Sequence, residues 1–333
     1  MLPEMIDGLT AWYDANKREL PWREPQPSAY HVWLSEIMLQ QTRVEAVKGY
    51  YGRFLEAAPT IAALARLDDD RLLKLWEGLG YYSRARNLKR TAQILMREHG
   101  GVLPRDPAEL IKLPGIGLYT AGAVASIAYG VPAPAVDGNV LRVLARAEGD
   151  FSNIALEQTK KAVAARLLSA MPKHAPGAFN QALMELGAVV CLPNGAPRCG
   201  QCPWQNSCAA LREGLIGQLP VKSAKKPRAV IERRLFILRC GERLALRRRP
   251  EHGLLAGLWE LPEAFALPGD LVVSRESAGS AVHIFTHREW HMTAERVVLS
   301  GRIEGFSWIT QEELEREFAL PSAFSGFRAA LFA

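Results

Sequence analysis

The sequence predicts a two-part protein, mainly helical over its first two-thirds and mixed α/β over its last third. Apolar residues recur at helical spacing through most of residues 1–190, whereas short strand-like stretches dominate beyond residue 230. Gly, Pro and Lys residues mark a linker before the change. Because 333 residues suit two domains, we place them at 1–213 and 229–333, with 214–228 as the linker.

Composition favours a soluble protein with a polyanionic partner. Hydrophobic residues make up 48% of the chain, charged residues 23%, and the formal net charge is +6. The first residues carry acids and no apolar signal-peptide core, and the longest apolar stretch, 121–136, is broken by Gly130, Pro132 and Pro134. We therefore expect a monomer without a membrane partner, cytoplasmic and, in a bacterium, associated with the nucleoid. A basic run at 222–249 fits either a solvated linker or a phosphate-facing stripe.

Two helices are predicted before residue 60, at 4–20 and from about Tyr30 to Leu55. In the second helix Glu36 interrupts an apolar cluster. Burial there would raise its pKa, as a general acid at neutral pH requires; an exposed glutamate on the outer helix face is the alternative. The motif Met-Leu-Gln-Gln-Thr-Arg follows at 38–43. Its paired glutamines suggest hydrogen bonds to base edges or filling of a base stack.

Further helices are expected at 60–67, 69–76 and 85–98. The last two flank Glu-Gly-Leu-Gly-Tyr-Tyr-Ser-Arg at 77–84, a loop whose glycines lie beside two tyrosines and Arg84. Such a loop is able to wedge an aromatic side chain between base steps, although tyrosines folded into the helical core are the alternative.

A helical hairpin is predicted at residues 106–146. Asp106 caps a short helix, Leu-Pro-Gly-Ile-Gly at 113–117 forms a turn, and a second helix follows over 119–129. Backbone amides at such a turn suit a DNA phosphate. Asp137 starts a third helix in the motif Val-Asp-Gly-Asn-Val; it is either an N-cap alone or an N-cap with a second role.

Two more helices, predicted at 157–171 and 176–190, precede a cysteine cluster. The cysteines are spaced C-x7-C-x2-C-x5-C from Cys191 to Cys208, which implies metal binding; spacing alone leaves zinc and an iron–sulfur cluster open. Beyond the linker, strands are predicted at 234–239, 243–248, 281–286, 296–300 and 305–308, followed by a helix that Thr310 caps.

These motifs resemble the helix-hairpin-helix/Gly-Pro-Asp superfamily of DNA base-excision glycosylases and, within it, the adenine DNA glycosylases of the MutY family. The match is most specific over residues 36–45, 77–86 and 113–142. It implies that Glu36 protonates adenine and activates water, that Asp137 stabilises the sugar cation, and that Tyr119 lies near the sugar. Asn139 belongs to the same catalytic motif. The DNA-binding residues it implies are Gln41, Thr42, Tyr81, Arg84, Leu113, Gly115, Gly117 and Gln181, with Tyr81 as the wedge beside Gln41.

The resemblance also implies a 4Fe–4S cluster and a lesion-reading domain. Cysteine ligands would be Cys191, Cys199, Cys202 and Cys208, although the family's usual first spacing is six and here it is seven. The last domain looks like the Nudix-like module of these enzymes, without the glutamate-rich pyrophosphatase box, so we expect binding rather than hydrolysis. Phe285, Thr286 and His287 match a loop that reads 8-oxoguanine in the family; a simple hairpin edge is the alternative.

The expected activity is excision of adenine opposite 8-oxoguanine or guanine in duplex DNA, by base flipping and acid-assisted hydrolysis of the N-glycosidic bond. Residue 119 indicates whether the enzyme cuts the strand. The endonuclease III enzymes have a lysine at this position that forms a Schiff base, and the tyrosine of this chain cannot form one. A monofunctional enzyme is therefore expected. The alternatives are an endonuclease III-like glycosylase/lyase acting on another damaged base and a non-catalytic helix-hairpin-helix DNA-binding protein.

Overall fold

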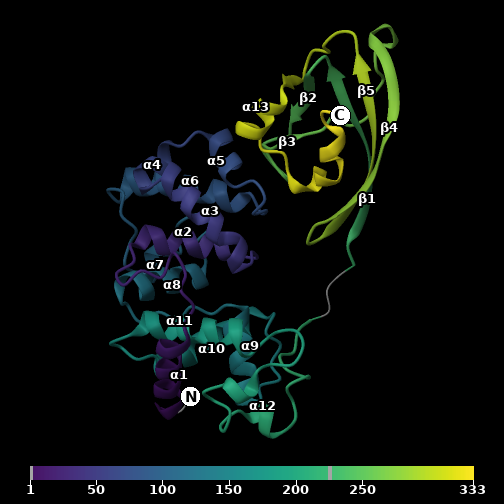
Figure 1. Cartoon of the computed structure of the whole chain (residues 1–333). Helices are drawn as coiled ribbons and strands as arrows, with labels where there is room; N and C mark the ends of the chain where they lie inside the picture. The colour runs from purple at the N-terminus through teal and green to yellow at the C-terminus, as the bar shows by residue number, and fades with distance from the viewer. Residues whose placement is uncertain (1–2, 224–226) are drawn as a thin grey trace. The chain divides into compact units, whose positions relative to one another are not determined.

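The computed structural model describes residues 3–223 and 227–333, and it confirms a helical first part followed by a mixed sheet (Figure 1). Residues 224–226 of the predicted linker lie outside the described residues. The chain forms two compact units: residues 1–66 with 87–224, and residues 67–86 with 225–333. Within the described ranges, every helix is too short or too polar to cross a bilayer.

The first unit is built from helices. They are α1 (Pro3–Asn16), α2 (Ala29–Leu39), α3 (Val44–Ala57), α4 (Ile61–Arg66), most of α6 (Ser83–Glu98), α7 (Pro107–Leu110), α8 (Leu118–Tyr129), α9 (Gly138–Glu148), α10 (Glu157–Ala170), α11 (Pro176–Val189) and α12 (Ala209–Arg212), with the 3-10 turn η1 (Cys199–Gln201). The ends of α8, α10 and α11 agree with the predicted ends to within one residue, because glycine, proline and capping residues mark them locally.

The prediction of one helix from Tyr30 to Leu55 is wrong. The chain leaves the helix after Leu39 and starts α3 at Val44, and Gln41 between them adopts φ 59°. Left-handed backbone at a non-glycine residue is strained and is found where the surrounding structure enforces it. The break places both glutamines in a loop at the end of α2.

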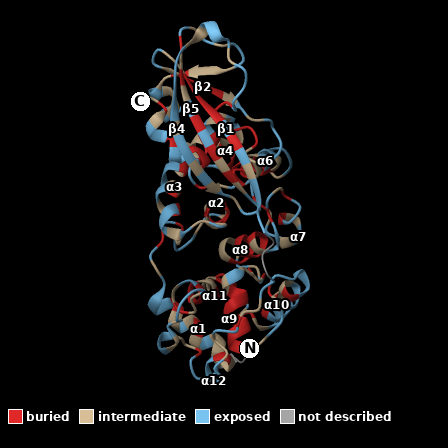
Figure 2. Ribbon diagram, turned by 90° about the vertical axis from the view of Figure 1, so that its right-hand side faces the viewer, coloured by how far each residue is buried: buried red, intermediate tan, exposed pale blue. Residues whose placement is uncertain are grey.

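Helices α8, α9 and α11 form the buried centre of the first unit, and α9 is almost wholly red in Figure 2. Asn180 of α11 is fully buried; its amide oxygen accepts from the Ala135 amide and its amide nitrogen donates to the Ala133 carbonyl. These bonds fix the segment just before α9. At Gly187 of α11 an added Cβ would come within 2.6 Å of the Asn139 Cβ, so only glycine permits this approach of the two helices.

The second unit contains α5 (Asp69–Leu75), the first turn of α6 and a six-stranded mixed sheet of order β3-β2-β1-β5-β4, with β6 also paired to β2. Only the β1–β5 pair is parallel among the pairs of described strands. The strands are β1 (Ala229–Cys240), β2 (Arg243–Arg248), β3 (Trp259–Glu260), β4 (Val272–Ile284), β5 (Arg288–Leu299) and β6 (Ser307–Ile309), and the remaining helices are η2 (Gly269–Leu271), α13 (Gln311–Arg316) and η3 (Ser322–Ala330).

Strands β4 and β5 form a hairpin much longer than the two short strands predicted there, and η3 packs on β4 (Figure 1). Aromatic and aliphatic side chains of η3, among them Phe324 and Phe327, complete the core on that face of the sheet. The capping box at Thr310 and Glu313 is confirmed. In this unit the prediction of β2 is correct to the residue, those of β1, β4 and β5 are too short, and β3, η2 and η3 were not predicted.

Part of the basic run serves the fold of this unit. The carboxylate of Glu260, 1% exposed, accepts hydrogen bonds from Arg233, Arg247 and Arg249. Arg233 also lies 4.1 Å from the ring centre of Trp290. A buried carboxylate needs such partners. Neither a solvated linker nor a phosphate stripe accounts for these three arginines.

Candidate active site

One pocket of about 600 Å³ in the first unit collects most of the residues predicted to act in catalysis. Its walls come from α2, the loop after α2, the start of α8, the segment before α9, and α11. The predicted residues that line it are Glu36, Gln41, Thr42, Gly117, Tyr119, Asp137, Asn139 and Gln181. The pocket is large enough for a nucleobase with part of its sugar.

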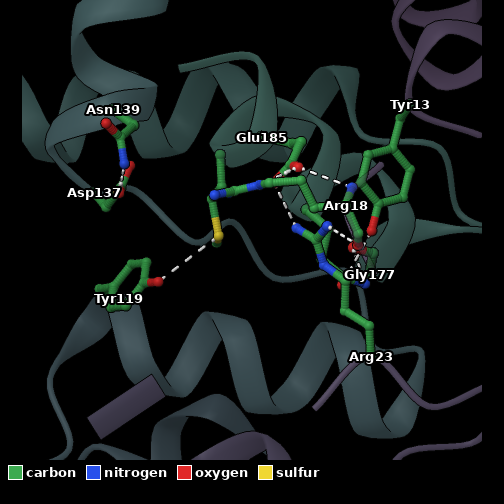
Figure 3. Close-up of polar contacts among 10 residues, drawn as sticks. Tyr13, Arg18, Arg23, Tyr119, Asp137, Asn139, Gly177 and Glu185 are labelled. Carbon is green, nitrogen blue, oxygen red and sulfur yellow. Dashed lines mark hydrogen bonds and ion pairs between the residues drawn. The ribbon is translucent and has the colours of Figure 1, made fainter. Parts of the chain in front are cut away.

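Glu36 lies on the buried face of α2 and is 7% exposed. Burial raises its pKa to about 7, while the hydrogen bond from the Tyr119 hydroxyl opposes that rise. Burial also raises the pKa of Tyr119 far above its usual value, so this hydroxyl stays protonated and donates. The same hydroxyl lies 3.7 Å from the sulfur of Met184 (Figure 3). Glu36 is therefore able to carry a proton at neutral pH, as a general acid must.

Asp137 is the N-cap of α9, as the sequence suggested, and it also faces the pocket. Its Oδ1 accepts from the Val140 amide at 2.7 Å and its Oδ2 from the Asn139 side chain at 2.8 Å (Figure 3). Burial raises the pKa of Asp137, and both of these hydrogen bonds act against the rise. The two alternative readings of Asp137 are thus compatible, because capping leaves the carboxylate at the pocket wall.

Hydrogen bonds continue from Asp137 toward the first cysteine. Arg142 donates to the Asn139 side-chain oxygen at 2.9 Å and, through Nε, to the Cys191 carbonyl at 2.8 Å. Arg146, one turn further along α9, donates to the Cys191 sulfur at 3.4 Å. Helix α9 therefore ties the pocket and the cysteine loop to one rigid element.

The pocket is also lined by an ion-pair cluster that the sequence did not reveal. Glu185 of α11 is 1% exposed and accepts from Arg18 at 2.7 and 2.8 Å and from Arg23 at 2.8 Å (Figure 3). Burial alone would raise the pKa of Glu185, but hydrogen bonds from Arg18 and Arg23 outweigh it and lower the pKa to about 2. The available signal was an acid between Met184 and Leu186 in an apolar helix, the same signal that marked Glu36.

The predicted hairpin is present as α7, a turn and α8. Gly115 has φ 77° and, like Gly117, is exposed, and Gly117 begins α8 without a side-chain cap. Leu113 is buried, and its amide donates to the Leu110 carbonyl. The two glycines thus present backbone at the start of a helix, where an anion binds well. Phosphate contact by the three residues stays a prediction.

The four clustered cysteines line a second, apolar pocket of the first unit, walled by Val143, Leu186, Trp204 and Ile216, and none forms a disulfide. Burial raises the pKa of Cys199 and Cys202, and the neighbouring thiols raise it further. Among the described residues no three His, Cys, Asp or Glu side chains converge as ligands of a single ion. Four free thiols around one apolar pocket fit a thiolate-held cluster, whose ligands surround a volume rather than a point.

In the second unit the predicted wedge and the predicted lesion-reading loop lie together. Phe285 packs on Trp290 and its amide pairs with the Arg288 carbonyl, so Thr286 and His287 form the exposed tip of the β4–β5 hairpin. The Tyr81 and Thr286 hydroxyls are 2.7 Å apart.

Tyr81 is 48% exposed and has φ 45°, whereas the Arg84 guanidinium is buried and donates to the Leu79 and Gly80 carbonyls. Arg84 thus supports the turn that presents Tyr81. A direct contact of Arg84 with DNA stays a prediction.

Comparison with known proteins agrees with this geometry. Residues 34–173 match the HhH-GPD superfamily of base excision DNA repair proteins, and residues 234–329 match the NUDIX domain. Among solved structures, a thermostable thymine-DNA glycosylase has a TM-score of 0.57 at 27% identity, covering 62% of this chain and 95% of that one. Endonuclease III in a non-covalent DNA complex gives 0.54 at 26% identity, covering 65% and 99%.

Curated relatives extend the match over both units. Adenine DNA glycosylase of Arabidopsis thaliana is 38% identical over 88% of this chain and 56% of its own length. The human enzyme is 34% identical over 92% and 70%, and that of Schizosaccharomyces pombe 33% identical over 98% and 89%. With relatives of this name at 33–34% identity over more than two-thirds of their own length, and both domain matches in the predicted order, the chain belongs to the adenine DNA glycosylase family.

Proposed function

We propose that this protein removes adenine from duplex DNA where the adenine lies opposite 8-oxoguanine or guanine, without cutting the strand. The observation that carries the proposal is that Glu36, hydrogen-bonded by Tyr119, lines the same pocket as Asp137. A carboxyl with a pKa of about 7 is able to donate a proton to a leaving base, and a second carboxylate is able to stabilise the positive sugar left behind.

In this mechanism the flipped deoxyadenosine enters the pocket lined by α2 and α11. Glu36 protonates the base, the N-glycosidic bond breaks with its electron pair going to the base, and Asp137 faces the oxocarbenium-like sugar. Glu36, now ionised, takes a proton from the water that adds to the sugar carbon. Tyr119 provides a hydroxyl and no amine at this site, so no Schiff base forms and the strand stays intact.

The proposed division of labour follows the predicted domains. Residues 1–213 carry catalysis and hold duplex DNA through Gln41, Thr42, the hairpin glycines and Gln181, and residues 229–333 read the opposite base through Phe285, Thr286 and His287. A threonine at 286 keeps the hydroxyl donor needed for that recognition. Tyr81 enters the base stack as the wedge.

We further propose that Cys191, Cys199, Cys202 and Cys208 hold a 4Fe–4S cluster. When bound, the cluster would cross-link the loop from 191 to 208 and fix its fold beside α9. Broad visible absorbance of the purified protein and about four iron atoms per chain are expected. Colourless protein containing one zinc ion would contradict the assignment.

Single-turnover excision tests the reaction. Duplexes carry adenine opposite 8-oxoguanine or guanine, and products are separated with and without alkali. Breaks only after alkali are expected, faster opposite 8-oxoguanine. Breaks without alkali would indicate an endonuclease III-like lyase, and binding without any product would indicate a DNA-binding protein that lacks catalysis. Equal rates on both duplexes would refute the lesion reading while leaving adenine excision in place.

A further inference from the structure

The turn that presents Tyr81 is held by an ion-pair cluster with the C-terminal part of the second unit. Lys74, at the end of α5, donates to Glu77 at 2.6 Å and to the carbonyls of Leu314 and Phe318 at 2.8 and 3.2 Å. Leu314 belongs to α13 and Phe318 follows it, so the lysine caps the carboxyl end of that helix.

Glu77 completes the cluster from the turn itself. One carboxylate oxygen pairs with Lys74, and the other accepts from the Leu320 amide at 3.2 Å and from Arg328 at 2.9 Å. The Lys74 and Glu77 side chains are only 15% and 16% exposed. Charge-assisted hydrogen bonds in such partly buried surroundings are stronger than exposed ion pairs, such as Arg316 with Glu312 in the same unit.

The far side of the turn is held as well. Arg86 donates to the Ala256 carbonyl at 2.7 Å. Within the turn, the Trp76 indole and the Arg84 guanidinium both donate to the Gly80 carbonyl. Tyr81 therefore stands on a stiff turn whose two flanks are fastened to the C-terminal part of the unit.

From these contacts we propose that Lys74 and Glu77 form a positioning staple: they fix the turn from 77 to 81 against α13 and η3, so that Tyr81 and Thr286 meet DNA as one element. The inference rests on the proposed function, because it assigns the wedge and the lesion reader to a single rigid assembly. Preference for 8-oxoguanine then depends on residues that touch neither the lesion nor the adenine. Glu77 and Lys74 are positioning residues in this scheme.

The test uses the full-length protein with Glu77→Gln, which keeps the size and the acceptor for the Leu320 amide but removes the charge. The matched control is Glu157→Gln, which breaks an exposed pair with Lys160 at the same 2.6 Å and the same three-residue spacing. Two quantities are measured: hydrogen exchange of residues 77–82 and 311–320, and the ratio of single-turnover rates opposite 8-oxoguanine and guanine. A general loss of structure lowers both rates together, whereas loss of the staple lowers the ratio.

Glu77→Gln is expected to speed exchange in both segments and to reduce the ratio about fivefold, and the control is expected to change neither. Unchanged exchange would overturn the staple. Faster exchange with an unchanged ratio would overturn its link to lesion reading. A wild-type ratio of one refutes the proposed lesion reading and this link together, and it is seen before any variant is made.

Discussion

Two glutamates line the same pocket, and their surroundings give them different charge states. Glu36 of α2 and Glu185 of α11 are both buried, at 7% and 1% exposure. Burial raises the pKa of Glu36 to about 7, and two arginines lower that of Glu185 to about 2. Burial is common to both residues, so their partners decide the protonation state. Glu36 accepts a hydrogen bond from the neutral Tyr119 hydroxyl and feels only the charge of Arg23, whereas Glu185 accepts hydrogen bonds from both Arg18 and Arg23.

In the proposed function this difference in pKa separates the reacting group, Glu36, from a structural one, Glu185. The pKa values of about 7 and about 2 lie on opposite sides of the ordinary value of 4.5, and each difference corresponds to about 3 kcal/mol. Ionisation of Glu36 therefore lowers the free energy of unfolding, whereas the charged Glu185 raises it. A group that is unfavourable for folding and yet present at the pocket is typical of a site built for chemistry.

The largest effect is expected for Glu36→Gln. Glutamine still accepts the Tyr119 hydrogen bond but has no acidic proton, so excision of adenine should fall by about a thousandfold or more. Single-turnover kinetics on the 8-oxoguanine duplex measure the loss, and gel-shift binding of the same duplex serves as the control for DNA affinity. Turnover within tenfold of wild type would remove Glu36 from the reaction.

Stability sharpens the comparison further. The pKa of Glu36 is higher in the folded than in the unfolded protein, so ionisation of Glu36 lowers the free energy of unfolding as pH rises from about 4.5 to about 7. Glu36→Gln removes this loss and should therefore stabilise the protein at pH 8, by up to about 3 kcal/mol. Glu185 is the reverse case. Its contribution is present above about pH 4.5 and is lost as pH falls through about 2, so Glu185→Gln should destabilise by about 3 kcal/mol at pH 8.

Urea unfolding of both variants at pH 8 measures these opposite signs. Glu157→Gln, which removes an exposed carboxylate, provides the baseline for a charge change without burial. If both variants changed the free energy of unfolding in the same direction, burial alone would govern both glutamates and their partners would not distinguish them.

How far the sequence predicts this molecule depends on whether a feature is local. Helices α8, α10 and α11 were predicted almost to the residue because caps, glycines and prolines mark their ends. The break after α2 was missed, because Gln41 holds a left-handed backbone that only tertiary surroundings enforce. Tyr81 is strained in the same way, so two non-glycine residues predicted to enter the base stack both depart from local preference.

Long-range pairing explains the rest of what was missed. Glu36 and Asp137 were found because each lies in a specific motif. Arg18 and Arg23 reach Glu185 across more than 160 residues, and no local pattern connects them. The joining of residues 67–86 to the C-terminal part likewise follows from contacts such as those of Lys74, which only the fold reveals.

The smallest predicted effect concerns Tyr119, the neutral partner in the comparison. Excision should fall as pH rises above about 7, because Glu36 then loses the proton that it must donate. The Tyr119 hydrogen bond favours the ionised carboxylate, so Tyr119→Phe should raise the pKa of Glu36 and move the alkaline limb of the rate profile upward by about half to one pH unit.

Single-turnover rates between pH 5.5 and about 9 resolve such a shift. The direction in which the alkaline limb moves in Tyr119→Phe distinguishes two explanations. A move to higher pH means that the Tyr119 hydrogen bond is the main interaction that opposes the effect of burial on the pKa of Glu36, ahead of the charge of Arg23. A move to lower pH would mean that water fills the space left by the hydroxyl and solvates the carboxylate. Tyr119 would then keep Glu36 protonated by excluding water from the site.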